Sequence, residues 1–230
     1  MKFIKKLLLV ILIIIVLVFA IIGKIGYDYY QKSLKVKSFD KRISEVENNI
    51  NFVKYDELSN NYINAVVAVE DHRFFKHGAI DPISILRAIY INISNMELQE
   101  GGSTITQQVA KNVFFTQEET IRRKSGELFA SIDLEKNCSK KEIFAIYVNT
   151  SYFGNGYYGI KEASKGYFNK EPKDLNLDES SMLAGIPNAP SVYAPKKNPD
   201  LAKKRQNHVL RKMIQYNYIS QAEADSIKNN

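Results

Sequence analysis

The sequence is poor in the residues that build disulfide frameworks and zinc sites. Its 230 residues include no tryptophan, three histidines and one cysteine, Cys138, so no disulfide can form within the chain. The histidines form neither an HExxH pattern nor a Cys/His cluster, which argues against a zinc centre. A dense lysine and arginine stripe with interleaved aromatic residues is also missing, so nothing indicates a nucleic-acid partner.

The longest apolar run lies at the N-terminal end. Residues 7–22 contain no polar side chain, and three lysines precede them. With its apolar neighbours the run approaches the roughly 20 residues that cross a bilayer, and it exceeds the about 7–15 residues of most signal-peptide cores. Because N-terminal lysines favour the cytoplasmic side, we predict a cytoplasmic tail (residues 1–6) and a transmembrane anchor (residues 7–23). A cleaved signal peptide, cut after Ala20, is the alternative.

The rest of the chain divides into a polar segment and one domain. Residues 24–60 carry many charges and few apolar positions, which is typical of a stalk or an adapting segment. Residues 61–230 are enough for one domain with its own core, and their mostly helical apolar spacing predicts a mainly α fold. The formal charge of +7 falls to +4 without the three N-terminal lysines (7 − 3), which suits an anionic membrane surface or a phosphate-bearing substrate.

Local signals place several helices. We predict one helix over residues 64–75, and another that Asp81 caps with Pro82 at its first position. This second helix is apolar on nearly every side over residues 83–93, so it is either buried or in contact with lipid. Further starts are predicted at Thr120 and at Ser139, which opens a capping-box pattern.

Glu70 stands between an apolar helix and a pair of aromatic residues. It ends the segment AVVAVE and shortly precedes Phe74 and Phe75. Partial removal from water raises the pKa of such a carboxyl toward the range that suits a general base. The alternative is an ordinary carboxylate at a helix end, paired with Arg73.

Two further polar patterns follow. In GGSTITQQVAKN, Thr104, Gln108 and Lys111 have the spacing of one helix face, and the glycines let backbone N–H groups approach a ligand. Such a face suits a sugar pyrophosphate, whereas the alternative is a solvated helix surface. In IRRKSGE, Glu127 lies one turn after the cations Arg123 and Lys124, either as surface salt bridges or as a second functional carboxylate. Paired carboxylates are typical of enzymes that act on glycosyl bonds.

Five segments occur in a fixed order: EDHRFFKHGAID, GGSTITQQVAKN, RKSGE, KKEIFAIYVNTSYFGNGYYGIKEASKGYF and LAGIPNAPSVYAP. Over residues 64–213 the chain thereby resembles the family 51 glycosyltransferases, the peptidoglycan glycosyltransferases. The resemblance implies a mainly α, lysozyme-like globular domain with a membrane-dipping subdomain, preceded here by one transmembrane helix. The apolar helix at residues 83–93 falls where the family has its membrane-embedded segment.

The resemblance also implies an activity. Lipid II would be polymerised into glycan strands with β-1,4 bonds, inversion and release of undecaprenyl pyrophosphate. Glu70 matches the family's general base, Lys111 the residue that steadies the pyrophosphate, and Glu127 the second acid near the leaving group. Mg²⁺ or Mn²⁺ assists in some members, and no organic cofactor is expected. The substrate-binding residues implied by the matching are Ser103, Thr104, Gln108, Asn112, Arg123, Lys124, Asn188 and Arg205.

The implied partners are lipid II, the nascent glycan strand, the membrane, and penicillin-binding transpeptidases or other wall proteins. The catalytic domain would lie outside a bacterial cell membrane, held by a single span. Because the resemblance ends near Met213, close to the end of the sequence, we expect the monofunctional type.

One position departs from the family pattern. Many members have an arginine eight residues after the lysine matched by Lys111, and Glu119 stands there in this chain. We expect Arg122 to substitute for it in part. Two other interpretations stay open: a lysozyme-like hydrolase that cleaves finished glycan, and an inactive membrane-bound scaffold, which Glu119 would favour.

Overall fold

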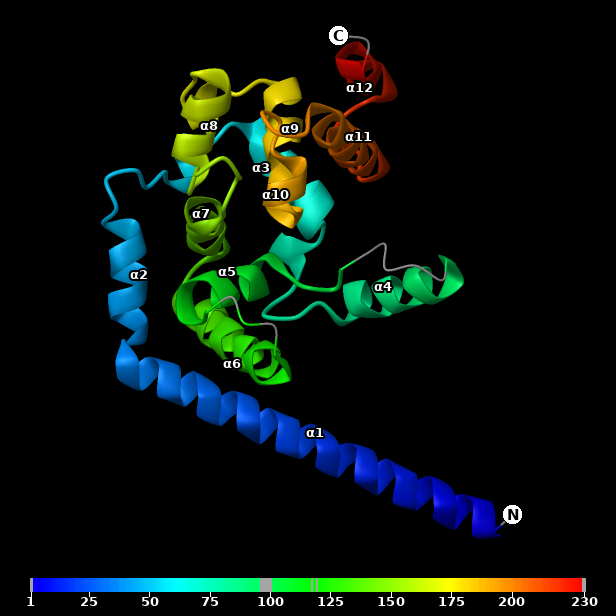
Figure 1. The fold of residues 1–230 in the computed structure, drawn as a ribbon. Helices are drawn as coiled ribbons and strands as arrows, with labels where there is room; N and C mark the ends of the chain where they lie inside the picture. Colours follow the sequence, from blue (N-terminus) through cyan, green and yellow to red (C-terminus); the bar gives the residue numbers. More distant parts are fainter. Residues whose placement is uncertain (1, 96–100, 117, 119, 229–230) are drawn as a thin grey trace.

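The computed structural model describes residues 2–95, 101–116, 118 and 120–228, and within these ranges the regular structure is helical (Figure 1). Its only extended pairing in those ranges is an isolated bridge between Tyr152 and Tyr158. The helices are α1 (Lys2–Val36), α2 (Phe39–Glu47), α3 (Asn60–Glu70), α4 (Pro82–Asn95), α5 (Ile105–Phe114), α6 (Ile121–Asn137), α7 (Lys140–Thr150), α8 (Ile160–Phe168), α9 (Leu177–Gly185), α10 (Pro190–Tyr193), α11 (Pro199–Gln215) and α12 (Gln221–Lys228). Short 3-10 turns lie at Tyr55–Glu57, Phe74–Lys76, Pro172–Asp174 and Ile186–Asn188.

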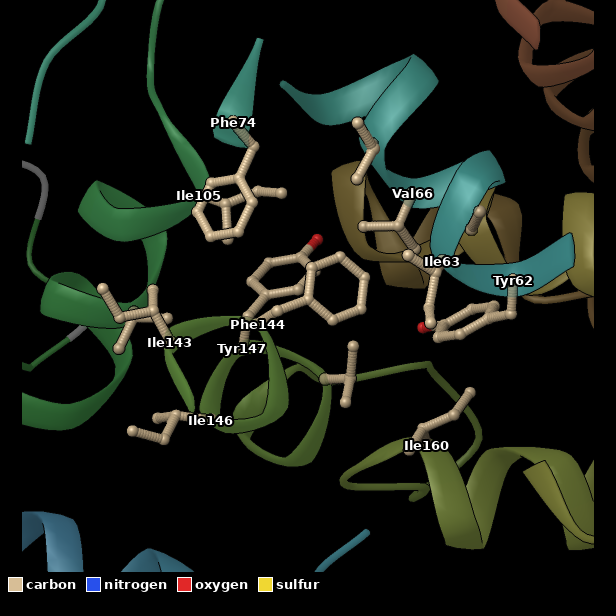
Figure 2. Close-up of a cluster of buried hydrophobic side chains, with 14 of the residues drawn as sticks. Tyr62, Ile63, Val66, Phe74, Ile105, Ile143, Phe144, Ile146, Tyr147 and Ile160 are labelled. Atoms are coloured by element: carbon tan, nitrogen blue, oxygen red, sulfur yellow. The ribbon is translucent and has the colours of Figure 1, made fainter. Parts of the chain in front are cut away.

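Helix α7 lies at the centre of the domain. Its residues 143–148 are all buried, as expected for a helix that is apolar on every side. Figure 2 shows Phe144 and Tyr147 of α7 between Phe74 and the α3 side chains around Val66. The mainly α fold predicted from the sequence is confirmed.

The predicted helix over residues 64–75 is wrong at its C-terminal end. Helix α3 ends at Glu70, and Asp71 has the non-helical dihedrals φ −160° and ψ 78°. The reason is tertiary, because the Asp71 carboxylate accepts hydrogen bonds from the distant backbone N–H of Ile105 and from His77. The caps predicted at Thr120, Ser139 and Asp81 are confirmed, since each side chain accepts a hydrogen bond from a backbone N–H in the first turn of its helix.

Helix α1 is the one helix of the described residues with the length and composition to cross a membrane. Its stretch Phe3–Val36 contains a window of mean hydropathy 3.3, no part of which is buried in the protein. Figure 1 shows the N-terminal part extending away from the domain, while the C-terminal part packs against α6. This arrangement fits the predicted anchor.

Residues 24–60 pack against the domain along much of their length. Tyr30 and Ile43, from α1 and α2, are buried in the main core cluster, together with Val53 and Leu58 from the connection to α3. The segment was predicted as a stalk or an adapting segment from its many charges. The few apolar residues between those charges are the ones that dock it.

Helix α4 projects from the domain on the side toward which α1 extends (Figure 1). Its side chains Ile83, Leu86 and Tyr90 are exposed by 55, 67 and 72%, whereas Ala88 is buried. The side chains of residue 89 and of residues 91–95 lie outside the described set. An apolar helix with this exposure is not a core helix, so of the two predicted alternatives the lipid-facing one fits.

Candidate active site

A cleft of about 360 Å³ opens where the end of α3, the start of α5, the first turns of α6 and the middle of α11 meet. Nine of the eleven residues predicted as catalytic or substrate-binding line it: Glu70, Ser103, Gln108, Lys111, Arg123, Lys124, Glu127, Asn188 and Arg205. Segments from five separate parts of the chain thus deliver polar side chains to one concave surface.

Glu70 is the last residue of α3 and points into this cleft with a side chain that is 9% exposed. The Gln108 amide donates a hydrogen bond to Oε2 at 2.7 Å, and an Arg205 guanidinium nitrogen lies 3.8 Å from Oε1. Among the described residues, Oε1 is buried and has no hydrogen-bond partner. Burial raises the pKa of Glu70, and it outweighs the Gln108 hydrogen bond and the Arg205 charge, which lower that pKa. A carboxyl with one free oxygen and a raised pKa is equipped to accept a proton.

Glu127 is the second carboxylate of the cleft, and its side chain is 1% exposed. Arg123 donates to one carboxylate oxygen from the turn before, and the Lys124 ammonium lies 2.9 Å from the other. Lys124 also donates to the Ser103 hydroxyl at 2.9 Å, which ties α6 to the loop before α5. Because Lys124 is half exposed and Glu127 is buried, the Lys124 ammonium faces the cleft and the Glu127 carboxylate lies beneath it.

Lys111 lies on α5 within the electrostatic reach of both carboxylates. Burial lowers the pKa of Lys111, whereas the charges of Glu127 and Glu70 raise it. Arg123 and Lys124 act in the same direction as burial, because like charges disfavour the protonated amine. Three basic side chains, Lys111, Arg123 and Lys124, lie around the single Glu127 carboxylate at this end of the cleft, which suits a phosphate group.

Two predicted substrate-binding residues do not line the cleft. Thr104 is the N-cap of α5: its hydroxyl accepts from the Gln107 N–H, it donates to the Ala79 carbonyl at 3.0 Å, and it is 2% exposed. Gln108 and Lys111 share the predicted face, but Thr104 sits beneath it and fixes where the helix starts. Asn112 lines a separate polar cavity on α5 beside α2 and α7.

Arg122 does not take the place expected for it beside the pyrophosphate. Its guanidinium lies 4.5 Å from the centroid of the Tyr29 ring on α1, and it pairs with Glu118 at 3.6 Å. It is not part of the cleft lining. Glu119, the residue that departs from the family pattern, lies outside the described residues.

Residues 37–214, more than half of the chain, match the protein-family model described as "Transglycosylase". The chain belongs to the transglycosylase family. It is 46% identical over 172 residues to penicillin-binding protein 1F of Bacillus subtilis (strain 168), which covers 75% of this chain and 24% of that protein. It is 41% identical over 178 residues to penicillin-binding protein 1A of Aquifex aeolicus (strain VF5), covering 77% and 24%.

This transglycosylase-family chain spans about a quarter of the length of the curated relatives it matches. Among solved structures, the crystal structure of penicillin-binding protein 1A from Haemophilus influenzae matches 54% of this chain and 15% of that chain, with 28% identity and a TM-score of 0.38. The family match begins at residue 37, within the segment predicted as a stalk.

Sequence reasoning missed a cluster at the other end of the cleft. The His72 ring stacks on Tyr216 with centroids 4.2 Å apart, and Arg87 of α4 donates to the Tyr216 hydroxyl at 3.2 Å. All three residues line the cleft, as does Lys212 of α11. One signal was present in the sequence: Arg87 is the only charged residue in the otherwise apolar stretch of residues 83–93.

Asp71, next to Glu70, was also missed, and it connects three segments. Its Oδ2 accepts from the Ile105 N–H at 3.1 Å, and its Oδ1 lies 2.8 Å from Nε2 of His77. The other His77 ring nitrogen lies 2.7 Å from the Gly78 carbonyl oxygen. Both partners of the ring are oxygen acceptors, an arrangement that favours a ring donating from both nitrogens. Burial lowers the pKa of His77, but the hydrogen bond and charge of Asp71 outweigh it and raise that pKa.

The residues at Glu127 do not fit a divalent ion. Both carboxylate oxygens already bind cationic side chains, so Mg²⁺ or Mn²⁺ would have to displace Arg123 or Lys124. Asp71, His77 and Asp81 offer ligand atoms within 4.8 Å of one another. However, both His77 ring nitrogens and the Asp81 carboxylate already have partners: His77 lies against Asp71 and Gly78, and Asp81 accepts from Ser84 and pairs with Arg73. The involvement of Mg²⁺ or Mn²⁺ stays a prediction.

Proposed function

We propose that the protein is a peptidoglycan glycosyltransferase that polymerises lipid II into linear glycan strands for a bacterial cell wall. Membership of the transglycosylase family supports the general activity. The observation that carries the assignment is the arrangement of the cleft. Within the described residues, Glu70 presents a buried oxygen that accepts no hydrogen bond, and Lys111, Arg123 and Lys124 lie around Glu127. A base for a sugar hydroxyl and a counter-charge for a pyrophosphate are the two groups that the reaction needs.

Glu70 acts as the general base in this proposal. Its Oε1 takes the proton from the 4-hydroxyl of the acceptor sugar as that oxygen attacks the anomeric carbon of the growing strand. Gln108 keeps Oε2 engaged at 2.7 Å, so the carboxylate presents Oε1 in a fixed direction. Attack on the face opposite the leaving group forms the β-1,4 bond with inversion, because the old carbon–oxygen bond breaks on the other side.

The cations around Glu127 stabilise the leaving group. As the bond to undecaprenyl pyrophosphate breaks, the electron pair passes to a phosphate oxygen, and Lys111, Arg123 and Lys124 neutralise the charge that develops there. Glu127 contributes by holding Arg123 and Lys124 in place, since its buried carboxylate binds both. These cations favour catalysis to the extent that they bind the pyrophosphate more strongly in the transition state, where its charge has grown, than in the bound substrate.

The membrane supplies the substrate. Lipid II carries a long polyprenyl chain, and the exposed apolar side chains of α4 lie beside the cleft that Arg87 lines. We place the domain on the outer face of a bacterial cell membrane, with α1 as the span and α4 against the lipid surface. The nascent strand and penicillin-binding transpeptidases are the partners that this location predicts.

Polymerisation of labelled lipid II by the purified full-length protein in liposomes tests the proposal. We expect a ladder of glycan products that a glycan hydrolase degrades, and no ladder with a moenomycin-type inhibitor or with Glu70→Gln. Shortening of finished glycan without polymerisation would identify the hydrolase alternative. No reaction on either substrate, with the protein correctly folded, would support the scaffold alternative.

A further inference from the structure

The membrane-spanning helix touches α6 at a crossing where no side chain fits. A Cβ atom added to Gly26 of α1 would lie 2.1 Å from the Ser125 hydroxyl oxygen and 2.6 Å from the Ser125 carbonyl carbon. Contacts under about 3 Å with backbone atoms force the two helices apart. Gly26 is therefore required by the approach of the two backbones.

A hydrogen bond fixes the register at the same point. The Ser125 hydroxyl donates to the carbonyl oxygen of Ile22 at 2.8 Å, one turn before Gly26. On the other side of the crossing, a Cβ atom on Gly126 would lie 3.1 Å from the Phe115 ring and 3.3 Å from Tyr29. Gly26, Ser125 and Gly126 thus allow the close approach of the two helices. The hydrogen bond from Ser125 to Ile22 sets the position of α1 along its axis relative to α6.

Contacts further along α1 hold the crossing in place. The Tyr29 and Phe115 rings stack with centroids 5.3 Å apart, and the Tyr30 hydroxyl donates to Asp133 of α6 at 2.9 Å. One turn later, the Ser33 hydroxyl donates to the Phe114 carbonyl at the end of α5 at 2.6 Å. These contacts reach both helices that carry the cationic end of the cleft.

The crossing and the site share the same turn of α6. Ser125 and Gly126 lie between Lys124 and Glu127 in the sequence, so one side of this turn meets α1 and the other side meets the cleft. A helix moves as a rigid body over one turn, because its backbone hydrogen bonds resist local stretching. A displacement of α6 at Ser125 is therefore passed on to Glu127.

We propose that Gly26 and Ser125 are positioning residues, and that the crossing of α1 and α6 sets the place of Glu127 and its cations in the cleft. The membrane-spanning helix is then part of the active-site scaffold as well as a tether. The expected effect on kcat rests on the proposed function. The crossing of the two helices can also be measured without any activity.

Gly23 offers a matched control for Gly26. It lies one turn earlier on the same helix, and a Cβ atom there would meet no atom within 4 Å. Replacing either glycine by alanine changes helix propensity equally, so a difference between the variants reports the crossing. We expect Gly26→Ala to lower kcat with lipid II on the order of 10-fold or more, because misplacement by about 1 Å can cost 10²-fold. KM and the helical circular dichroism should stay near wild type, and Gly23→Ala should change none of these.

A fluorescence measurement tests the crossing without catalysis. Since the chain has no tryptophan, Tyr29→Trp introduces a single reporter beside Phe115 and Gly126. In this background we expect Gly26→Ala to shift the emission to longer wavelength, because the indole gains contact with water, and Gly23→Ala to leave it unchanged. If polymerisation fails in every protein, the emission still decides the crossing, while the absence of polymer counts against the proposed function alone.

Three results would overturn the inference. The first is a shifted emission in Gly26→Ala with wild-type kcat, and the second is equal behaviour of the two alanine variants.

Should Gly26→Ala not fold, Ser125→Ala replaces it, because it removes the hydrogen bond to Ile22 and adds no atom. We expect it to lower kcat about two- to tenfold, because one hydrogen bond that sets the crossing is lost. Wild-type kcat in Ser125→Ala would be the third contrary result.

Discussion

The side-chain amide of Gln108 binds only one of the two carboxylate oxygens of Glu70, at 2.7 Å. The other oxygen is buried within the described structure, 3.8 Å from the Arg205 guanidinium and without a hydrogen bond. One oxygen therefore orients the carboxylate, and the other is available to accept a proton. This division distinguishes Glu70 from Glu127, whose two oxygens both bind cations.

Replacement of Glu70 by glutamine should separate activity from stability. We expect Glu70→Gln to lower polymerisation by about 10²–10⁴-fold, the usual contribution of a general base. The pKa of Glu70 is raised by burial, so the unfolded carboxyl ionises near 4.5 and the folded one at higher pH. Between these values the folded protein holds the proton more tightly, and its stability falls as the pH rises. The neutral glutamine avoids that loss, so its thermal midpoint at neutral pH should exceed that of wild type. A lower midpoint would contradict this account.

The hydrogen bond from Gln108 should set the acid limb of the pH–rate profile. Donation from Gln108 to the carboxylate lowers the pKa of Glu70, against the larger effect of burial. Gln108→Met removes the donor with little change in volume, so the pKa rises and the base form appears only at higher pH. We expect the acid limb of kcat/KM to move to higher pH in this variant. An unmoved limb would show that another group controls it.

Lys111 and Arg122 should differ in their effect on catalysis. Lys111 lines the cleft, whereas Arg122 lies over the Tyr29 ring outside it. We therefore expect Lys111→Ala to lower kcat by roughly 10²-fold or more, through lost charge stabilisation of the leaving group. Arg122→Ala should cost less than about 10-fold, acting through the packing of α1. Comparable losses in both variants would place Arg122 at the phosphate after all.

Glu119→Arg should be neutral or activating, because it restores the arginine that many family members have at this position. A severe loss of polymerisation in this variant would contradict that expectation.

Helix α4 should bind the lipid surface independently of α1. In a protein shortened to begin at Lys24, which keeps Gly26, we expect residual binding to vesicles of anionic lipid. Replacing the exposed Ile83 and Leu86 by aspartate should release it, because each apolar side chain contributes about 1.5–3 kcal/mol when buried. Sedimentation with vesicles measures the binding. Because both side chains are more than half exposed, the helical circular dichroism should be kept; unfolding would assign them to the core instead.

The His77–Asp71 pair should stabilise the protein most at acidic to neutral pH. The pKa of His77 is raised above the ordinary 6.5, since Asp71 outweighs the effect of burial. A raised pKa in the folded state gives stability that is complete below the unfolded pKa and is lost as the pH rises through the folded one. The free-energy difference between wild type and His77→Gln, from urea unfolding, should therefore be largest below the ordinary His77 pKa of 6.5 and shrink as the pH rises above it. A constant difference would exclude an imidazolium at this position.

Much of the fold follows from signals within one turn of a helix. The caps at Thr120 and Ser139 were predictable because cap and capped N–H are three residues apart. The end of α3 was not, since Asp71 leaves the helix to bind Ile105, 34 residues further on. Thr104 was placed on the Gln108 face by spacing alone, but the loop before α5 turns it inward to Ala79.

Residue type and short-range order were enough to predict the apolar helix at the start, the mainly α class, the ordered motifs and the two cleft carboxylates. Three features needed the folded structure: which oxygen of Glu70 accepts no hydrogen bond, where Arg122 lies, and the contact of Gly26 with Ser125 across about a hundred residues of chain. Contacts of this kind depend on how helices far apart in the sequence pack. The spacing of residues along one helix predicts which residues share a face, but it does not predict which other helix packs against that face.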